Sequence, residues 1–186
     1  MRAKDWLRVG SFAGCLFLTL HLYGQGKKEE LRVILIRHAE KPEYGSDLNC
    51  QGMNRARMLP ALLYSRFGLP STTYIPAPSK KDPTRHSRMY QTIMPFISKY
   101  HLTLNSAYEE KDFTGIARDI LSKKGTILVV WDHSRLSGVA RALGIQDDEL
   151  RWPSKDYDGI WIITFHGGKA SLTKEKEGLK PSTACP

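Results

Sequence analysis

Two histidines in this sequence directly follow short apolar segments and stand next to other polar side chains. Arg37-His38 comes after the first of these segments, and Asp132-His133 comes after a later one. Weaker apolar segments precede a second group of polar side chains, which comprises Arg85, Arg88, Glu109, Glu110 and Asp112.

Guanidinium groups, imidazoles and carboxylates are the groups that phosphoryl transfer requires. Arginine binds phosphate oxygens through paired, charge-assisted hydrogen bonds. A neutral imidazole accepts the phosphoryl group as a nucleophile, and nearby arginine charges keep a histidine neutral by lowering its pKa. A carboxylic acid or a second histidine then supplies a proton to the leaving oxygen. The polar side chains above therefore suit transfer of a phosphoryl group to a histidine, provided that the fold brings them together.

The segments that precede these side chains have the length and composition of buried strands. Residues 31–36 and 126–131 are apolar at nearly every position, which is typical of strands buried between two layers. Residues 159–165 show a third strong pattern of this kind. Residues 72–75 and 102–107 are weaker strand candidates.

Helical patterns alternate with the predicted strands. Apolar residues recur at three- and four-residue spacing within residues 53–67, 89–97, 116–121 and 136–143. Pro60 falls inside the first of these segments. It is expected to kink that helix or to begin a new one, because proline cannot donate the hydrogen bond that a helix interior requires.

Strands that alternate with helices predict an α/β fold, here a three-layer α/β/α sandwich with a mostly parallel central sheet. Ligands bind such sheets beyond the carboxyl ends of the strands. His38 and His133 both lie just past predicted strand ends, so we expect them to converge at one edge of the sheet. No internal repeat or low-complexity linker interrupts residues 31–180, and we predict a single domain over residues 25–186.

Four segments resemble the signature motifs of the histidine phosphatase superfamily, whose members share the phosphoglycerate mutase-like fold. RHAE at 37–40 is similar to the family's R-H-G-E motif, and RMYQT at 88–92 resembles its R-x-x-Q-T helix start. LNCQG at 48–52 resembles the L-T-x-x-G stretch that opens the first helix, and DH at 132–133 matches the second histidine after a core strand. The segments occur in the expected order across residues 31–165, so the combination is far more specific than any one motif.

The resemblance implies a phosphatase that hydrolyses phosphate esters or anhydrides through a phosphohistidine intermediate on His38, with no metal or other cofactor. It assigns phosphate binding to Arg37, Arg88 and His133, and His133 also belongs to the catalytic set. Glu110 is the preferred candidate for the proton donor. The acids that stay open as alternatives for this role are Glu109 and Asp112.

Two positions depart from the family pattern. Ala39 stands where the R-H-G-E motif has glycine, and Asp132 precedes the second histidine where glycine is usual. Neither change removes a reacting group. Asp132 is expected to orient His133 or to shift its pKa.

The expected partner is a small phosphorylated substrate, and two alternative functions stay open for such a fold. One is a catalytically silent phosphate- or anion-binding domain, and the other is a protein-phosphohistidine phosphatase. The net charge is +9, but no block of five or more Lys or Arg occurs, so no nucleic-acid partner is predicted. The spacings of zinc ligands and the glycine-rich nucleotide motifs do not occur in the sequence either.

Residues 1–24 have the layout of a secretory signal peptide. Arg2, Lys4 and Arg8 form a basic start, and residues 9–23 are mostly apolar. The apolar run is shorter than the roughly 20 residues that a membrane-spanning helix needs, and an uncleaved N-terminal anchor is the alternative. We therefore predict a secreted or periplasmic protein that meets a membrane only if this segment stays uncleaved.

Removal of residues 1–24 would leave Cys50 and Cys185 as the two cysteines of the chain. An oxidising compartment permits a disulfide between them, but the sequence does not show whether the two residues meet. The disulfide, the oligomeric state and the identity of the substrate stay open at this point.

Overall fold

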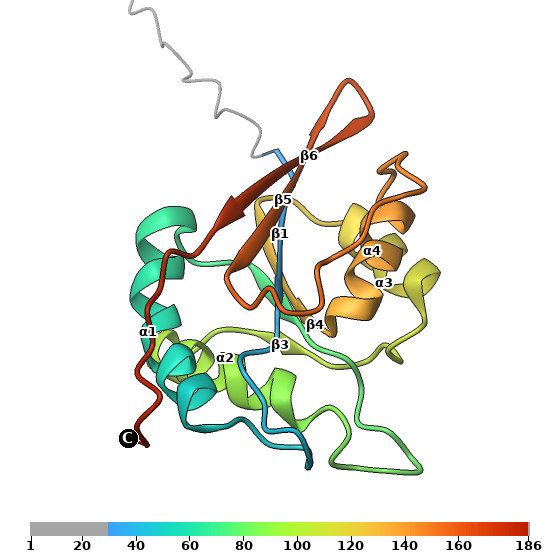
Figure 1. The fold of residues 1–186 in the computed structure, drawn as a ribbon. Helices are drawn as coiled ribbons and strands as arrows, with labels where there is room; N and C mark the ends of the chain where they lie inside the picture. Colours follow the sequence, from blue (N-terminus) through green and yellow to red (C-terminus); the bar gives the residue numbers. More distant parts are fainter. Residues whose placement is uncertain (1–29, 186) are drawn as a thin grey trace, which may run out of the picture.

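The computed structural model describes residues 30–185, which form one sheet covered by helices on both faces (Figure 1). The elements in chain order are β1 (Arg32–Arg37), α1 (Cys50–Phe67), β2 (Thr72–Tyr74), α2 (Ser87–Tyr100), β3 (Leu104–Asn105), α3 (Phe113–Leu121), β4 (Thr126–Trp131), α4 (His133–Ala142), β5 (Gly159–His166) and β6 (Lys169–Lys176).

The six strands are arranged in the order β3-β2-β4-β1-β5-β6. The first four strands in this order run parallel, whereas β5 pairs antiparallel with β1 and β6 pairs antiparallel with β5. In Figure 1, α1 and α2 lie on one side of the sheet, and α3 and α4 lie on the other. The predicted three-layer α/β/α sandwich with a mostly parallel sheet is therefore confirmed.

Two hydrophobic clusters fill the spaces between the sheet and its helices. Successive side chains of β1 point to opposite faces, so Val33 and Leu35 pack with α3 and α4, while Ile34 and Ile36 pack with α1 and α2. None of these four side chains is more than 1% exposed. Burial of both faces explains why the strand is apolar at consecutive positions rather than at alternate ones.

The hairpin partner β6 was not among the predicted strands. Its side chains are mostly exposed and include three lysines, so it lacks the apolar pattern on which the other strand predictions depend. A two-residue turn at Gly167 and Gly168 connects β5 to β6, and both glycines have positive φ angles of 57° and 79°. Adjacent glycines favour tight hairpin turns because they adopt positive φ without steric cost. The Gly-Gly pair was therefore the signal that could have identified this hairpin.

Two predicted elements differ from the structure in their extent. The strand predicted at 102–107 is reduced to the two residues of β3. Helix α1 starts at Cys50, where the Asn49 side chain caps it by accepting a hydrogen bond of 2.8 Å from Gly52 N. The helix continues through Pro60 to Phe67, so no new helix begins at the proline.

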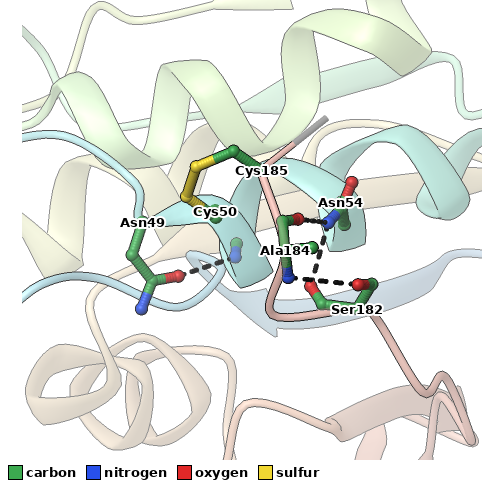
Figure 2. The surroundings of a disulfide bond; sticks show 7 residues. Asn49, Cys50, Asn54, Ser182, Ala184 and Cys185 are labelled. Carbon is green, nitrogen blue, oxygen red and sulfur yellow. Dashed lines mark hydrogen bonds between the residues drawn. A yellow bond between two sulfur atoms is a disulfide. The ribbon is translucent and has the colours of Figure 1, made fainter.

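The C-terminal segment returns to the start of α1 and is attached there (Figure 2). Cys185 forms a disulfide with Cys50, and their Cα atoms are 4.5 Å apart. The Asn54 side-chain amide also donates hydrogen bonds to the carbonyl oxygens of Ser182 and Ala184, at 2.9 and 2.7 Å. The pairing that the sequence left open is thus made in the structure.

The predicted signal peptide or anchor at 1–24 lies outside the described residues. Among the helices of residues 30–185, none has both the length and the apolar character needed to cross a membrane.

Candidate active site

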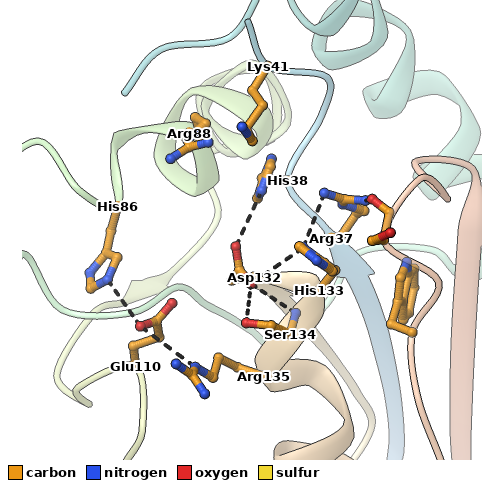
Figure 3. A network of polar contacts seen from close by, with 12 residues as sticks. Arg37, His38, Lys41, His86, Arg88, Glu110, Asp132, His133, Ser134 and Arg135 are labelled. Atoms are coloured by element: carbon orange, nitrogen blue, oxygen red, sulfur yellow. Dashed lines mark hydrogen bonds and ion pairs between the residues drawn. The ribbon is translucent and has the colours of Figure 1, made fainter. Parts of the chain in front are cut away.

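The two histidine segments meet at one edge of the sheet because their strands are parallel neighbours. Arg37 and Trp131 are the last residues of β1 and β4, and they are paired in register. The backbone N–H of His38 donates to the carbonyl oxygen of Trp131 at 3.2 Å. His38, Asp132 and His133 therefore leave the sheet side by side, as Figure 3 shows.

His38 is buried, and its hydrogen bonding defines which ring nitrogen is reactive. The side chain is 1% exposed, and Nδ1 lies 2.7 Å from the carbonyl oxygen of Ala39. A carbonyl only accepts hydrogen bonds, so Nδ1 carries the proton and Nε2 of the neutral ring presents a lone pair. Nε2 is buried and has no hydrogen-bond partner within residues 30–185. This nitrogen is therefore available to attack a phosphorus atom.

The loop that carries His38 is fixed from the first turns of α2. The Thr92 hydroxyl accepts a hydrogen bond of 2.9 Å from Ala39 N, and the same hydroxyl donates to the Arg88 carbonyl oxygen at 2.7 Å. Leu48 N donates to the Gln91 side chain at 2.9 Å. The RMYQT segment thus positions both the histidine loop and the approach to α1.

His133 is held in one tautomer by Arg37. Arg37 Nη2 lies 3.2 Å from His133 Nδ1, and because a guanidinium only donates, Nδ1 accepts and the ring proton resides on Nε2. Burial lowers the pKa of His133, and the charges of Arg37 and Lys41 lower it further, while Asp132 opposes this. His133 is therefore a neutral hydrogen-bond donor, as a ligand for a phosphoryl oxygen should be.

Arg37 is held in place by the loop that precedes β5. Its Nη1 donates to the carbonyl oxygens of Ser154 and Asp156, at 2.7 and 3.3 Å. The Tyr157 ring packs against the guanidinium with 3.7 Å between the ring centroid and Cζ. Burial lowers the pKa of Arg37, whereas Tyr157 and Asp132 raise it. Nothing in the sequence motifs indicated that Tyr157 and this loop would orient the phosphate-binding arginine.

Two further basic side chains approach His38 from the opposite side in Figure 3. Arg88 comes from the first turn of α2, and its Nε is buried without a hydrogen-bond partner among the described residues. Lys41 comes from the loop after β1 and points toward His38. The structure thus brings the predicted residues Arg37, His38, Arg88 and His133 together, and it adds Lys41, which the sequence motifs did not identify.

The carboxylate closest to the reactive nitrogen is Asp132. Its Oδ2 lies 3.6 Å from His38 Nε2, and its Oδ1 lies 3.4 Å from His133 Nδ1. Within the described part of the chain, no other carboxylate comes within 4.0 Å of a His38 ring nitrogen. The sequence predicted a role toward His133, but Asp132 also faces the candidate nucleophile.

The three acids considered as proton donors lie in different settings. Glu110 Oε2 faces Arg85, His86 and Arg135 at 3.4, 3.8 and 4.0 Å. Asp112 is the N-cap of α3 and accepts a hydrogen bond of 2.8 Å from Gly115 N, so its role is structural. Glu109 is exposed and, like Glu110, lines a cavity of about 340 Å³ beside the site. Figure 3 shows Glu110 between His86 and Arg135, at the margin of the group formed by His38, Asp132 and His133.

The donor atoms of His38, Asp132 and His133 lie within 4.8 Å of one another, which meets the spacing of a metal site. The surrounding charge argues for a different ligand. The Arg37 guanidinium contacts His133, and the side chains of Lys41 and Arg88 point toward the same group of residues. Positive side chains repel a cation and attract a phosphate. The arrangement therefore suits an anion better than a metal ion.

A close backbone contact brings α1 against the histidine loop. A Cβ atom at Gly52 would lie 2.9 Å from Glu40 N and closer still to the Glu40 carbonyl oxygen. Gly52→Ala is therefore expected to lower the free energy of unfolding by about 1–3 kcal/mol, because the backbone near His38 must shift. The better helix propensity of alanine offsets up to about 1 kcal/mol of this loss. Urea unfolding measures the change.

Gln51→Ala, in the same helical turn, is the control for this substitution. It makes no such clash and should change the free energy of unfolding by less than about 0.5 kcal/mol. Equal stability of Gly52→Ala and the parent would show that the loop adapts without cost.

A buried ion network connects the histidine loop to the C-terminal part of the chain. The Arg55 guanidinium donates to both oxygens of Glu40 at 2.8–3.1 Å and also donates to Glu177. Arg55 also lies 3.5 Å from Asp158 Oδ1. Three carboxylates thus share one guanidinium. Burial raises the pKa of Glu177 to about 7, with Arg55 opposing the rise and Asp158 and Glu40 adding to it.

This network should make stability depend on pH through Glu177. A carboxyl whose pKa is higher in the folded than in the unfolded chain binds more protons when folded. Its stabilising contribution is present below the ordinary pKa of 4.5 and is lost as the pH rises through about 7. In the parent, the free energy of unfolding should therefore fall between pH 4.5 and 7.5. In Glu177→Gln this fall should be smaller by up to about 3 kcal/mol.

Urea unfolding of both proteins across this pH range measures the effect. Glu175→Gln is the matched control, because Glu175 lies two residues earlier, at the end of β6, but pairs with Arg66 at the surface. If the two variants show the same pH dependence as the parent, Glu177 does not hold a proton in the folded chain.

Comparisons with known proteins agree with this geometry. No protein-family model matches the chain, and no curated protein sequence matches it. Among solved structures, the putative phosphohistidine phosphatase SixA from Agrobacterium tumefaciens superposes with a TM-score of 0.54 and 17% identity, covering 79% of this chain and 97% of that one. A putative alpha-ribazole-5'-P phosphatase from Escherichia coli K-12 gives a TM-score of 0.53 and 16% identity over 84% of this chain and 98% of that one.

A phosphoserine phosphatase from Entamoeba histolytica, in complex with phosphoserine, gives a TM-score of 0.51 and 13% identity, covering 79% of this chain and 96% of that one. These three structures belong to the histidine phosphatase superfamily. The likeness shows that the chain has the phosphoglycerate mutase-like fold of the histidine phosphatases.

Proposed function

We propose that this protein is a phosphatase that hydrolyses phosphate esters or anhydrides through a phosphohistidine on His38. The observation that carries the proposal is the state of His38 Nε2, a buried nitrogen with a lone pair and no hydrogen-bond partner among residues 30–185. Arg37 and His133 lie on one side of His38 and Arg88 on the other, while Asp132 faces Nε2. Arg37, Arg88 and His133 supply the positive charge and the donors that a phosphoryl group needs.

The first chemical step transfers the phosphoryl group to the histidine. The lone pair of Nε2 attacks phosphorus, the bond from phosphorus to the leaving oxygen breaks, and its electron pair stays on that oxygen. A carboxylic acid protonates the leaving oxygen. Glu110 is our proposal for this acid, since it lines the cavity beside the site where the leaving group would lie.

The second step returns the histidine to its starting state. A water molecule attacks the phosphoryl group, the P–N bond breaks, and the electron pair returns to Nε2. The proton that the water loses passes to the carboxylate formed in the first step, and phosphate leaves.

The cavity next to Glu110 offers room for the rest of a small phosphorylated substrate. The cavity of about 340 Å³ is lined by Lys80, Lys81, Arg85 and Lys111 as well as by the two acids. This volume lies within the usual range for small-molecule sites. The solved structures of similar fold carry names of phosphatases for phosphohistidine, phosphoserine and alpha-ribazole phosphate, which supports a phosphorylated substrate without identifying it.

We also propose that the protein is exported. The signal-like composition of residues 1–24 supports this, and so does the disulfide between Cys50 and Cys185, since disulfides persist mainly in oxidising compartments. Sequencing the N-terminus of the protein recovered from its host cells tests the proposal. A chain that starts after residue 24 is expected, and a full-length chain in the cytosol would overturn it.

Detection of the phosphoenzyme tests the proposed reaction. The chain is mixed rapidly with p-nitrophenyl phosphate in the presence of EDTA and quenched in alkali, in which phosphohistidine is stable. Peptide mass spectrometry should place the phosphoryl group on His38. Modification of another residue would overturn the proposed nucleophile, and phosphate binding without turnover between pH 4 and 8 would favour a silent anion-binding domain.

A further inference from the structure

The carboxylate of Asp132 is fixed in an orientation that directs one of its oxygens at the nucleophile. Asp132 is the N-cap of α4, and its Oδ1 accepts hydrogen bonds from Ser134 N at 2.8 Å and from Ser134 Oγ at 2.6 Å. The other oxygen, Oδ2, lies 3.6 Å from His38 Nε2. The carboxylate cannot turn away without losing the cap, which stabilises a protein by about 1 kcal/mol.

In the site without phosphate, Asp132 is ionised. Burial raises its pKa, but the contact with His38 and the hydrogen bonds from Ser134 outweigh burial and hold the pKa below its ordinary value. The titratable and charged groups around Asp132 come from several elements, as Figure 3 shows. They are Arg37 and His38 at the end of β1, Lys41 on the following loop, Arg88 on α2, and His133 and Ser134 on α4. Glu110 and Arg135 lie farther out.

A phosphoryl group that reaches His38 must come into contact with Asp132. Phosphorus has to approach the lone pair of Nε2, so its oxygens enter the space between Nε2 and Oδ2. Two ionised oxygens in contact repel each other, and one of them then binds a proton more tightly. With one proton between them, the same two oxygens form a strong hydrogen bond of about 2.5–2.7 Å.

We propose that a phosphoryl group binds at His38 together with one proton, which Asp132 shares with a phosphoryl oxygen. The inference rests on the proposed phosphate site and adds a property of it. The site binds the phosphoryl group in preference as the monoanion, which carries one more proton than the dianion. When the proton comes from solvent, one O–H bond forms as a hydronium ion loses its proton. When it arrives on the monoanion, that O–H bond is already present, and no other covalent bond changes. Binding therefore weakens as the pH rises, and turnover is favoured in acid.

The experiment counts the protons that accompany phosphate. Binding of inorganic phosphate to the full chain is measured by calorimetry at pH 8, in buffers that differ in ionisation enthalpy. Asp132→Asn keeps a good helix cap and removes the titrating group. The parent is expected to take up about one proton more per phosphate than Asp132→Asn, and the variant should bind phosphate roughly tenfold more tightly at this pH.

Asp112→Asn is the matched control, because Asp112 also caps a helix through Oδ1 but belongs to α3. It should take up as many protons as the parent does. Equal proton uptake by the parent and Asp132→Asn would overturn the inference while leaving the phosphate site intact. If neither protein binds phosphate, although both melt cooperatively at similar temperatures, the proposed phosphate site itself is wrong.

Discussion

His38→Ala is expected to lower the kcat for p-nitrophenyl phosphate by at least about a thousandfold, because the variant has no nitrogen that can accept the phosphoryl group. The side chain is buried, but its Nε2 makes no hydrogen bond within residues 30–185, so the loss should be one of chemistry more than of folding. Initial rates between pH 4 and 8, with EDTA present, measure the effect.

His166→Ala is the control for this loss. His166 is the last residue of β5, and its side chain is 68% exposed, so its removal should leave kcat unchanged. A His38→Ala protein that is folded and still turns over at more than about a tenth of the parent rate would be incompatible with a phosphohistidine intermediate.

Replacing both Cys50 and Cys185 by serine is expected to lower the free energy of unfolding by up to about 5 kcal/mol. The disulfide joins residues separated by 135 positions, so it closes most of the described chain into one loop. Such a link restricts the unfolded chain, and the stabilisation increases with the length of the loop that is closed. Typical domains are stable by only about 5–15 kcal/mol, so the loss is a large part of the total.

Urea unfolding of the parent and the double variant, each with and without dithiothreitol, measures this contribution. The reductant should destabilise the parent and leave the double variant unaffected. A difference below about 1 kcal/mol between the oxidised parent and the double variant would mean that the unfolded chain is little restricted by the disulfide.

Much of the fold could be predicted because burial leaves a local signal in the sequence. β1 and β4 lie between two helical layers, so consecutive apolar residues identify them, and helices with one buried face show regular spacing. β6 gave no such signal, since it pairs through its backbone while most of its side chains are exposed. The disulfide stayed open for a related reason, because pairing depends on the geometry of two distant segments.

The site was partly predictable for the same kind of reason. Parallel strand ends share an edge, so His38 and His133 could be expected at the same edge of the sheet. The structure adds that β1 and β4 are neighbours, which places the two side chains together. The support of Arg37 by the carbonyl oxygens of Ser154 and Asp156 could not be predicted, because any residue offers a carbonyl. The direction of Asp132 was also hidden, since the helix cap that turns Oδ2 toward His38 appears only in three dimensions.

The two outer strands of the sheet affect how copies of this chain meet. A long, flat and uncharged outer strand invites pairing with a second molecule. At one margin β3 is only two residues long, and at the other β6 exposes Lys169, Lys174 and Lys176 along its length. Both margins therefore resist sheet extension from one molecule into the next, which protects the protein from aggregation through its strands. Stable self-association would have to use the helical faces or the loops instead.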